Sequence, residues 1–161
     1  MSSGQREGPA ASLWLVAMQL AALAAVTWPW DAARFAVAAW LPVTVAFALG
    51  GWTLWHNRPG NFSVLPEPRN GARLITTGPY AHVRHPMYLA LMLFAAGCAL
   101  GWNTPVHWLA AAALVAVLEV KARREERLLQ ARFEGYAAYA ARTRRFVPRV
   151  GRPARSDRDA R

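Results

Sequence analysis

The chain has 161 residues, which suits a single domain, and 55% of them are hydrophobic, including eight tryptophans. Its formal net charge is +10, and its one cysteine excludes an internal disulfide framework. No nucleic-acid-reading motif accompanies the basic residues, so nucleic acid is not an expected partner. The charge points instead to an anionic membrane surface.

The hydrophobic residues form four runs, which are Ser12–Trp28, Phe35–Trp55, Tyr88–Trp102 and Pro105–Val120. Apart from Glu119 they contain no Asp, Glu, Lys or Arg, each of which costs about 2.5–3.5 kcal/mol at the centre of a membrane helix. They also lack the polar positions every 3.6 residues that a soluble bundle needs. We therefore expect an all-α integral membrane bundle of about four transmembrane helices.

The first run has the position of a secretory signal peptide. Against that role, Arg6 is the only cation before it and is offset by Glu7. The Trp-Pro-Trp sequence at residues 28–30 is also a poor cleavage site. We therefore interpret the run as a spanning helix.

The placement of arginine predicts the orientation and the domain limits. With four spans, only Arg34 of the 19 basic residues lies on the far side of the membrane. The positive-inside rule then places both termini and the loop 56–84 in the cytoplasm, in an inner or cell membrane. We expect a flexible N-terminus at 1–11, a membrane domain at 12–150 and a disordered basic tail at 151–161.

Prolines and glycines in and beside the runs predict where helices begin, bend or approach one another. Pro42 falls inside the second run and is expected to kink it, and Gly50 and Gly51 allow another helix to approach closely. Pro86 and Pro105 each suit the first turn of a helix, so they mark the starts of the third and fourth helices. These two helices are expected to form a tight antiparallel hairpin.

The hairpin brings two polar blocks to one depth. With its turn centred between residues 103 and 104, residues 81–82 are level with the glutamates at 125–126, at about 1.5 Å per residue. No Gly or Pro interrupts Val120–Phe133. We therefore expect the fourth helix to continue through Arg132 as a cytoplasmic extension, so that the two blocks line one cavity near the interface.

The side chains of this cavity suit a zwitterionic ligand. Carboxylates, two imidazoles, an arginine, phenols and the positive end of a helix are all available. Arg84 or the helix start can bind a carboxylate, and glutamate can bind an ammonium group and hydroxyls. A planar base can stack on tyrosine.

Five segments closely resemble the isoprenylcysteine carboxyl methyltransferase and phospholipid methyltransferase superfamily. They are Leu74–Tyr80, Arg84–Tyr88, Glu125–Glu126, Phe133–Tyr139 and Arg145–Arg149. The match covers about residues 60–150, whereas the first two runs match only in hydrophobicity. It implies S-adenosylmethionine as cofactor, membrane lipids as neighbours, and a hydrophobic or lipidated acceptor that enters from the bilayer.

The resemblance also implies roles for individual residues. The cofactor-binding candidates are Tyr80, Arg84, His85, Pro86, Tyr88, Glu125 and Glu126. The catalytic candidates are Arg145, which would lie near the acceptor, and His82, which like Glu125 can take a proton from an amine acceptor. Methyl transfer needs no metal, and no third ligand is suitably spaced from His82 and His85, so no metal site is expected.

A lipidic acceptor is expected to approach laterally, between helices. The candidates for its path are the segment after Pro42 and the face of the third helix around Leu89 and Leu93. Whether the acceptor is an amine, a carboxylate or a thiol stays open.

Structural alternatives exist for the same residues. Glu125 and Glu126 can form surface ion pairs with Lys121, Arg123 or Arg127 on their own helix. His85 can simply cap a helix. The two tyrosines at 136 and 139 can be packing groups.

Two other functions remain open. One is an NADPH-dependent membrane reductase of related helical fold, for which 161 residues leave little dinucleotide-binding surface. The other is a non-enzymatic four-helix transporter or assembly protein. A proton-coupled transporter should carry a carboxylate inside a span, and the four runs have none away from their ends.

Overall fold

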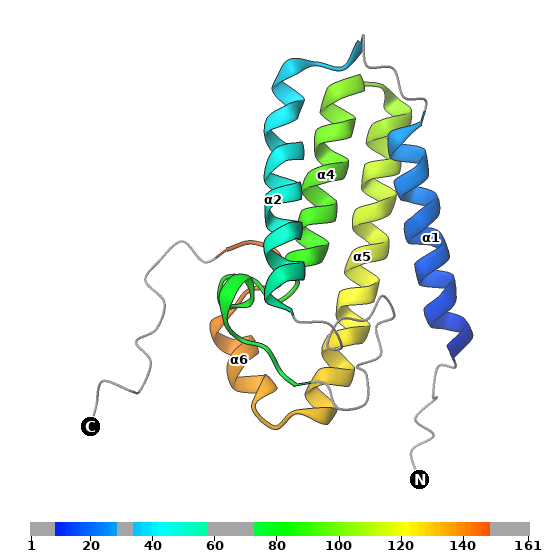
Figure 1. The fold of residues 1–161 in the computed structure, drawn as a ribbon. Helices are drawn as coiled ribbons and strands as arrows, with labels where there is room; N and C mark the ends of the chain where they lie inside the picture. Colours follow the sequence, from blue (N-terminus) through cyan, green and yellow to red (C-terminus); the bar gives the residue numbers. More distant parts are fainter. Residues whose placement is uncertain (1–8, 29–33, 58–72, 149–161) are drawn as a thin grey trace.

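The structure, a computed structural model, describes residues 9–28, 34–57 and 73–148. In these parts it contains helices and one isolated bridge but no strand, which confirms the all-α expectation. The long helices α1 (Pro9–Thr27), α2 (Trp40–His56), α4 (Pro86–Trp102) and α5 (Pro105–Arg132) lie side by side (Figure 1). The 3-10 turn η3 (Gly78–Ala81) and α6 (Tyr136–Arg142) gather at one end, here called the polar end.

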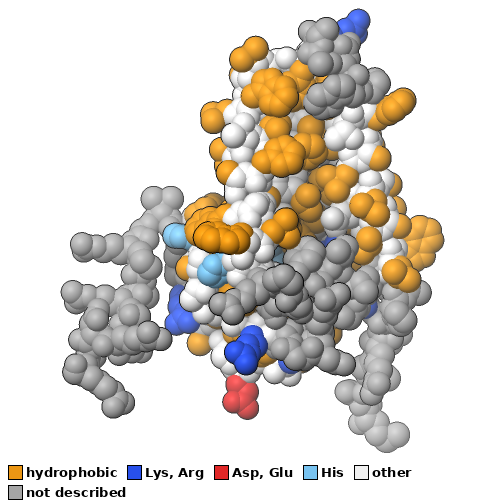
Figure 2. Space-filling model, viewed as in Figure 1, with side chains coloured by type: hydrophobic (Ala, Val, Ile, Leu, Met, Phe, Trp, Pro, Cys, Tyr) orange, Lys and Arg blue, Asp and Glu red, His pale blue; other side chains and the backbone are white. Residues whose placement is uncertain are grey.

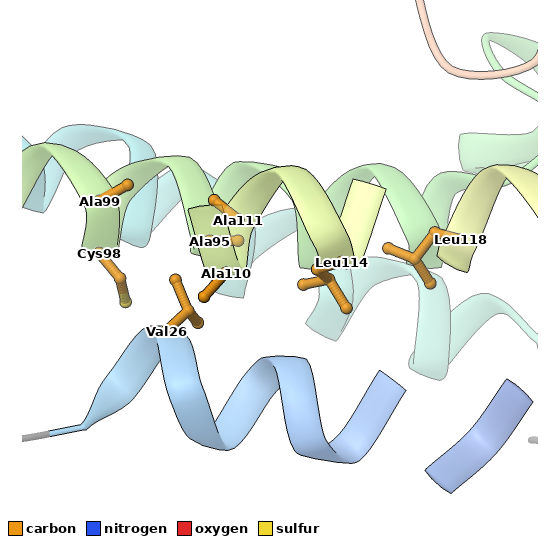
Figure 3. Close-up of a cluster of buried hydrophobic side chains, with 8 residues drawn as sticks. All are labelled: Val26, Ala95, Cys98, Ala99, Ala110, Ala111, Leu114 and Leu118. Atoms are coloured by element: carbon orange, nitrogen blue, oxygen red, sulfur yellow. The ribbon is translucent and has the colours of Figure 1, made fainter. Parts of the chain in front are cut away.

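The helices pack in the order α2, α4, α5, α1. A buried cluster joins the last three of these helices (Figure 3). Its members are Val26, Ala95, Cys98, Ala99, Ala110, Ala111, Leu114 and Leu118. Five of the eight are Ala or Cys, and small side chains let helix backbones approach closely where dispersion drives the association.

The closest approach to α4 uses its own glycines, not those of α2. A Cβ built on Gly97 would lie 2.6 Å from Cγ2 of Val43, and one built on Gly101 would collide with the ring of Phe35. At Gly51, in contrast, nothing lies within 4 Å of such a Cβ. A Cβ on Gly50 would lie 3.8 Å from that of Ala90, so α2 does contact α4 at this expected glycine, but the tighter contacts are at Gly97 and Gly101 of α4.

The sequence predicts a kink at Pro42 inside the second run, whereas the structure places Pro42 at the start of α2. The 3-10 turn η2 (Val37–Ala39) precedes α2, which begins at Trp40, so Pro42 lies in the first turn. The first four N–H groups of a helix have no partner within it, so proline is tolerated there. Pro86 and Pro105 begin α4 and α5 as predicted.

The sides of the bundle are apolar. Exposed fractions reach 71% for Trp14, 73% for Leu41, 47% for Leu100 and 73% for Leu109, which lie on four different helices. In the view of Figure 2, hydrophobic side chains cover the helical part, and most visible charged side chains lie at the polar end. Such a surface is typical of contact with lipid.

Two helical segments, Val37–His56 and Pro105–Arg132, are long and apolar enough to cross a membrane by length and composition. The apolar stretches Leu13–Thr27 and Pro86–Trp102 are shorter. The α5 helix runs through Arg132, as expected for the polar extension.

The expected terminal segments lie mostly outside the described residues. Helix α1 already begins at Pro9, inside the expected N-terminal segment 1–11. Residues 1–8 and the expected tail 151–161 fall outside the described ranges.

Candidate active site

A short backbone pairing holds the polar block before α4 against the segment after α6. Val83 and Arg144 form a parallel bridge, and the N–H of Arg84 donates to the Arg144 carbonyl at 2.9 Å. The N–H of His85 donates to the Arg145 carbonyl at 3.2 Å. The pairing therefore sets His85 beside Arg145 at the start of α4.

Glu126 on α5 accepts hydrogen bonds from three side chains of these two segments. Its Oε1 lies 2.9 Å from Nε of Arg84, 3.2 Å from Nε2 of His85 and 3.1 Å from Nε of Arg145. Its Oε2 lies 2.6 Å from Nη2 of Arg145. A carboxylate with this many charge-assisted hydrogen bonds holds the three segments together.

Arg84 also fixes the end of α6. Its Nη1 donates to the carbonyl of Ala140 at 3.0 Å and to the carbonyl of Thr143. These are carbonyls at a helix C-terminus, which lack partners within the helix and favour a cation. Arg84 thus links α5 to α6.

Glu125 has a different set of neighbours. The hydroxyl of Tyr88 donates to its Oε2 at 3.0 Å, and Nδ1 of His85 lies 3.5 Å from the same atom. The rings of His85 and Tyr88 stack with centroids 5.2 Å apart and planes 2° from parallel. The side chain of Glu125 is 30% exposed, against 14% for Glu126.

The charges around His85 favour its protonated form. Burial by itself lowers the pKa of His85, but hydrogen bonds and charges of Glu125 and Glu126 outweigh it, so the pKa is raised. Both ring nitrogens face carboxylate oxygens, as a doubly protonated ring requires. The hydrogen bond to Glu126 likewise raises the pKa of Arg145.

The turn η3 contacts both the end of α2 and α6. Nδ2 of Asn57 donates to the Tyr80 hydroxyl at 3.2 Å, and the hydroxyl of Tyr139 donates to the Tyr80 carbonyl at 2.7 Å. Gly78 has a φ of 60°, and a Cβ there would lie 2.6 Å from the His56 ring, so the turn needs glycine. Burial raises the pKa of Tyr80 to about 12, so this phenol stays protonated.

The two polar blocks meet as expected, but in a shifted register. Equal depth would place residues 81–82 beside the glutamates, whereas Arg84, His85 and Tyr88 contact them. Side chains on a helix lean toward its N-terminus. Because α4 and α5 are antiparallel, Tyr88 and Glu125 lean toward each other and meet across several residues of offset.

The structure brings together all but one of the polar site candidates. Tyr80, Arg84, His85, Tyr88, Glu125, Glu126 and Arg145 lie at the polar end, where Pro86 begins α4. His82 stands apart, since it is exposed and its ring centroid lies 6.3 Å from that of Trp52. The ion pairs of Glu126 run to Arg84, His85 and Arg145, not to its own helix.

Two further interactions were not anticipated. Nη1 of Arg145 lies 2.5 Å from Oε1 of Glu119, which is seven residues before Glu126 and so on the same helix face. Nζ of Lys121 donates to Oε1 of Gln19 at 2.5 Å and lies 5.6 Å from the ring centre of Tyr88. The isolated polar residue Gln19 in an apolar run was the available signal for the second interaction.

An apolar cavity of about 600 Å³ opens between α1, α2 and α4. Its lining residues on α4 are Met87, Ala90, Leu91 and Phe94, and those on α2 are Ala46, Phe47, Gly50, Gly51 and Leu54. The α2 wall agrees with the expected path after Pro42. The α4 wall lies on a different helix face from Leu89 and Leu93.

The chain is similar to known proteins over most of its length. A family model described as phospholipid methyltransferase matches residues 32–135. The chain is 31% identical to the nickel-cobalt-cadmium resistance protein NccN of Alcaligenes xylosoxydans xylosoxydans, over 86% of this chain and 64% of that protein. It is 35% identical to the cobalt-zinc-cadmium resistance protein CzcN of Cupriavidus metallidurans, over 51% of this chain and 38% of that protein.

The chain therefore spans less than two thirds of the length of either relative. The family match includes Arg84, His85, Tyr88 and both glutamates, and it ends before Arg145. Among the described residues, no group of three or more His, Cys, Asp or Glu is placed to hold a metal ion.

Proposed function

The chain belongs to the phospholipid methyltransferase family, and from this premise we propose that it is an S-adenosylmethionine-dependent methyltransferase acting on a membrane acceptor with an apolar portion. One observation carries the proposal. Side chains at the start of α4 contact Glu125 and Glu126 of α5. This contact lies inside the region that the family model matches and beside an apolar cavity.

The residues at the polar end fit this methyl donor. Glu125 is the more exposed carboxylate and can accept hydrogen bonds from an ammonium group or ribose hydroxyls. The ring of Tyr88, which is half-buried and stacks on His85, can offer aromatic surface to a purine. When bound, S-adenosylmethionine would supply a methyl carbon that carries the electrophilic character of a sulfonium group.

The protein residues then have to position the methyl donor and the membrane acceptor relative to each other. Glu126, held by Arg84, His85 and Arg145, keeps the ends of three segments in one arrangement. Such alignment can supply effective molarities of about 10⁵–10⁸ M in well-oriented reactions. The side chain of Arg145 pairs with two carboxylates, those of Glu119 and Glu126, so we assign it to positioning Glu126 and not to contact with the acceptor.

A proton must leave an amine acceptor during methylation. Glu125 lies in the site and is the better-placed base, because His82 is exposed beside Trp52. An acceptor that is already an anion needs no base. The assignment therefore gives Glu125 two roles, in binding the donor and in taking a proton from an amine.

The apolar cavity is the proposed seat of the acceptor's apolar portion. Met87 lines it, and the next residue, Tyr88, donates to Glu125. The apolar lining and the polar site thus begin at adjacent residues, which point about 100° apart on α4. An acceptor with its tail between α1 and α2 can present its head to that site from the bilayer.

We also propose four spans, with both termini and the site in the cytoplasm. Helix α4 lies between α2 and α5, which are both candidate spans, and α1 packs along α5. A 17-residue helix is about 25 Å long, slightly short of a hydrocarbon core of about 30 Å, which a bilayer accommodates by thinning. The region 12–150 would form this membrane unit.

Calorimetry on purified protein in detergent tests the function directly. We expect S-adenosylhomocysteine to bind wild type, and Glu125→Gln to bind it about tenfold or more weakly, because hydrogen bonds to charged groups contribute about 1.5–3 kcal/mol. Thermal unfolding of both proteins controls for folding. Binding of NADPH, without binding of S-adenosylmethionine or S-adenosylhomocysteine, would replace this proposal with that of an NADPH-dependent reductase.

The names of the relatives suggest a cellular readout. If the chain supports tolerance of cobalt or cadmium, and methyl transfer underlies that tolerance, Glu125→Gln should abolish both at normal expression. If cells still grow in cobalt or cadmium after methyl transfer is lost, a role in metal tolerance does not depend on the reaction.

A further inference from the structure

The side chain of Tyr136, at the start of α6, is buried without a hydrogen bond. Only 2% of the residue is exposed, and its hydroxyl has no partner among the residues described. Tyr139, one turn later, is equally buried at 3%, but its hydroxyl donates to the Tyr80 carbonyl at 2.7 Å. Buried hydroxyls are hydrogen-bonded in the large majority of cases, so the difference calls for an explanation.

Tyr136 begins α6, the helix that Arg84 anchors to the site, and the charges of Glu126 and Arg84 both act on its phenol. The carbonyls of Ala140 and Thr143 both accept from Arg84, whose Nε pairs with Glu126. Tyr136 is therefore part of the short helix that Arg84 anchors to the Glu126 carboxylate.

The surroundings of Tyr136 favour a neutral phenol that donates. Burial and the Glu126 carboxylate both raise the pKa of Tyr136, so its proton is retained at neutral pH. The oxygens of Glu126 already accept from Arg84, His85 and Arg145. Glu126 thus does not supply the acceptor that the Tyr136 hydroxyl lacks.

We infer that the Tyr136 hydroxyl is a ligand-binding donor of this site, which hydrogen-bonds an acceptor oxygen or nitrogen of the bound methyl donor. This inference rests on the proposed function. It assigns α6 a direct part in ligand binding, beyond packing. It also explains why one of two adjacent buried tyrosines has a protein partner and the other has none.

Tyr136→Phe and Tyr139→Phe form a matched pair that tests the inference. Removing an unpaired hydroxyl should leave the ligand-free melting temperature of Tyr136→Phe equal to wild type or higher, while its affinity for S-adenosylhomocysteine falls about tenfold. Tyr139→Phe should show the reverse. It should melt at a lower temperature, because the Tyr80 carbonyl loses its partner, and bind with little change per folded molecule.

Two results would overturn the inference while leaving the proposed function intact. One is Tyr136→Phe binding S-adenosylhomocysteine as tightly as wild type. The other is a loss of ligand-free stability in Tyr136→Phe as large as in Tyr139→Phe, which would mean that the hydroxyl has a protein partner. Failure of wild type itself to bind S-adenosylhomocysteine would instead overturn the proposed function, and this inference with it.

Discussion

Glu125 and Glu126 are adjacent in sequence but differ in surroundings. Glu126 accepts from Arg84, His85 and Arg145, whereas Glu125 is more exposed and faces Tyr88 and one nitrogen of His85. Adjacent helical residues point about 100° apart, so each glutamate meets a different set of partners. His85 contacts both carboxylates, and its protonation state therefore matters to the whole site.

The raised pKa of His85 predicts how stability depends on pH. A group whose pKa is higher in the folded state stabilises the fold fully below its unfolded pKa, about 6.5, and loses that contribution as pH rises through the folded pKa. We expect the melting temperature of wild type to fall more between about pH 6 and about pH 9 than that of His85→Gln. Parallel pH profiles would contradict this assignment.

At the scale of elements, α4 presents two different faces. Tyr88 faces α5 and the carboxylates, while Met87, Ala90 and Leu91 line the cavity toward α1 and α2. Helix α1 is tied to α5 by the bond between Gln19 and Lys121, and Lys121 is only 1% exposed. A buried cation needs such partners, so this bond favours one placement of α1 along the cavity.

Filling the cavity should separate acceptor binding from donor binding. We expect Leu91→Trp to raise the acceptor KM or abolish methyl incorporation into membrane lipid extracts, with unchanged affinity for S-adenosylhomocysteine. Leu93→Trp is the matched control, because Leu93 lies on the same helix outside the cavity lining. Equal effects of the two substitutions, or a preferred acceptor that is small and fully water-soluble, would rule out the lateral path.

At the scale of the whole molecule, the apolar sides and the polar end predict one orientation. The site, α6 and the extension of α5 share the polar end, and Asn103 lies at the opposite end of the α4–α5 hairpin. Reporter fusions at Asn103 and at the C-terminus should therefore report opposite sides of the membrane, with the C-terminus cytoplasmic. The same side for both would refute the four-span arrangement and the proposed cytoplasmic site.

The sequence by itself determined the helices and the two polar blocks. Absence of charge in the runs predicted apolar helices, and Pro86 and Pro105 marked two of their starts, because both signals act within a few residues. The resemblance predicted which residues of each block belong to the site. The position of Pro42 within the run did not reveal that α2 begins at Trp40, two residues before it.

Only the tertiary structure decided how the blocks join. The pairing of Val83 with Arg144 and the convergence of Arg84 and Arg145 on Glu126 depend on segments about 20 to 60 residues apart. The same holds for the separation of His82 from the site and for the unpaired hydroxyl of Tyr136. Local propensity specifies where a helix begins and ends, but contacts between distant segments follow from helix packing and from the direction in which side chains lean.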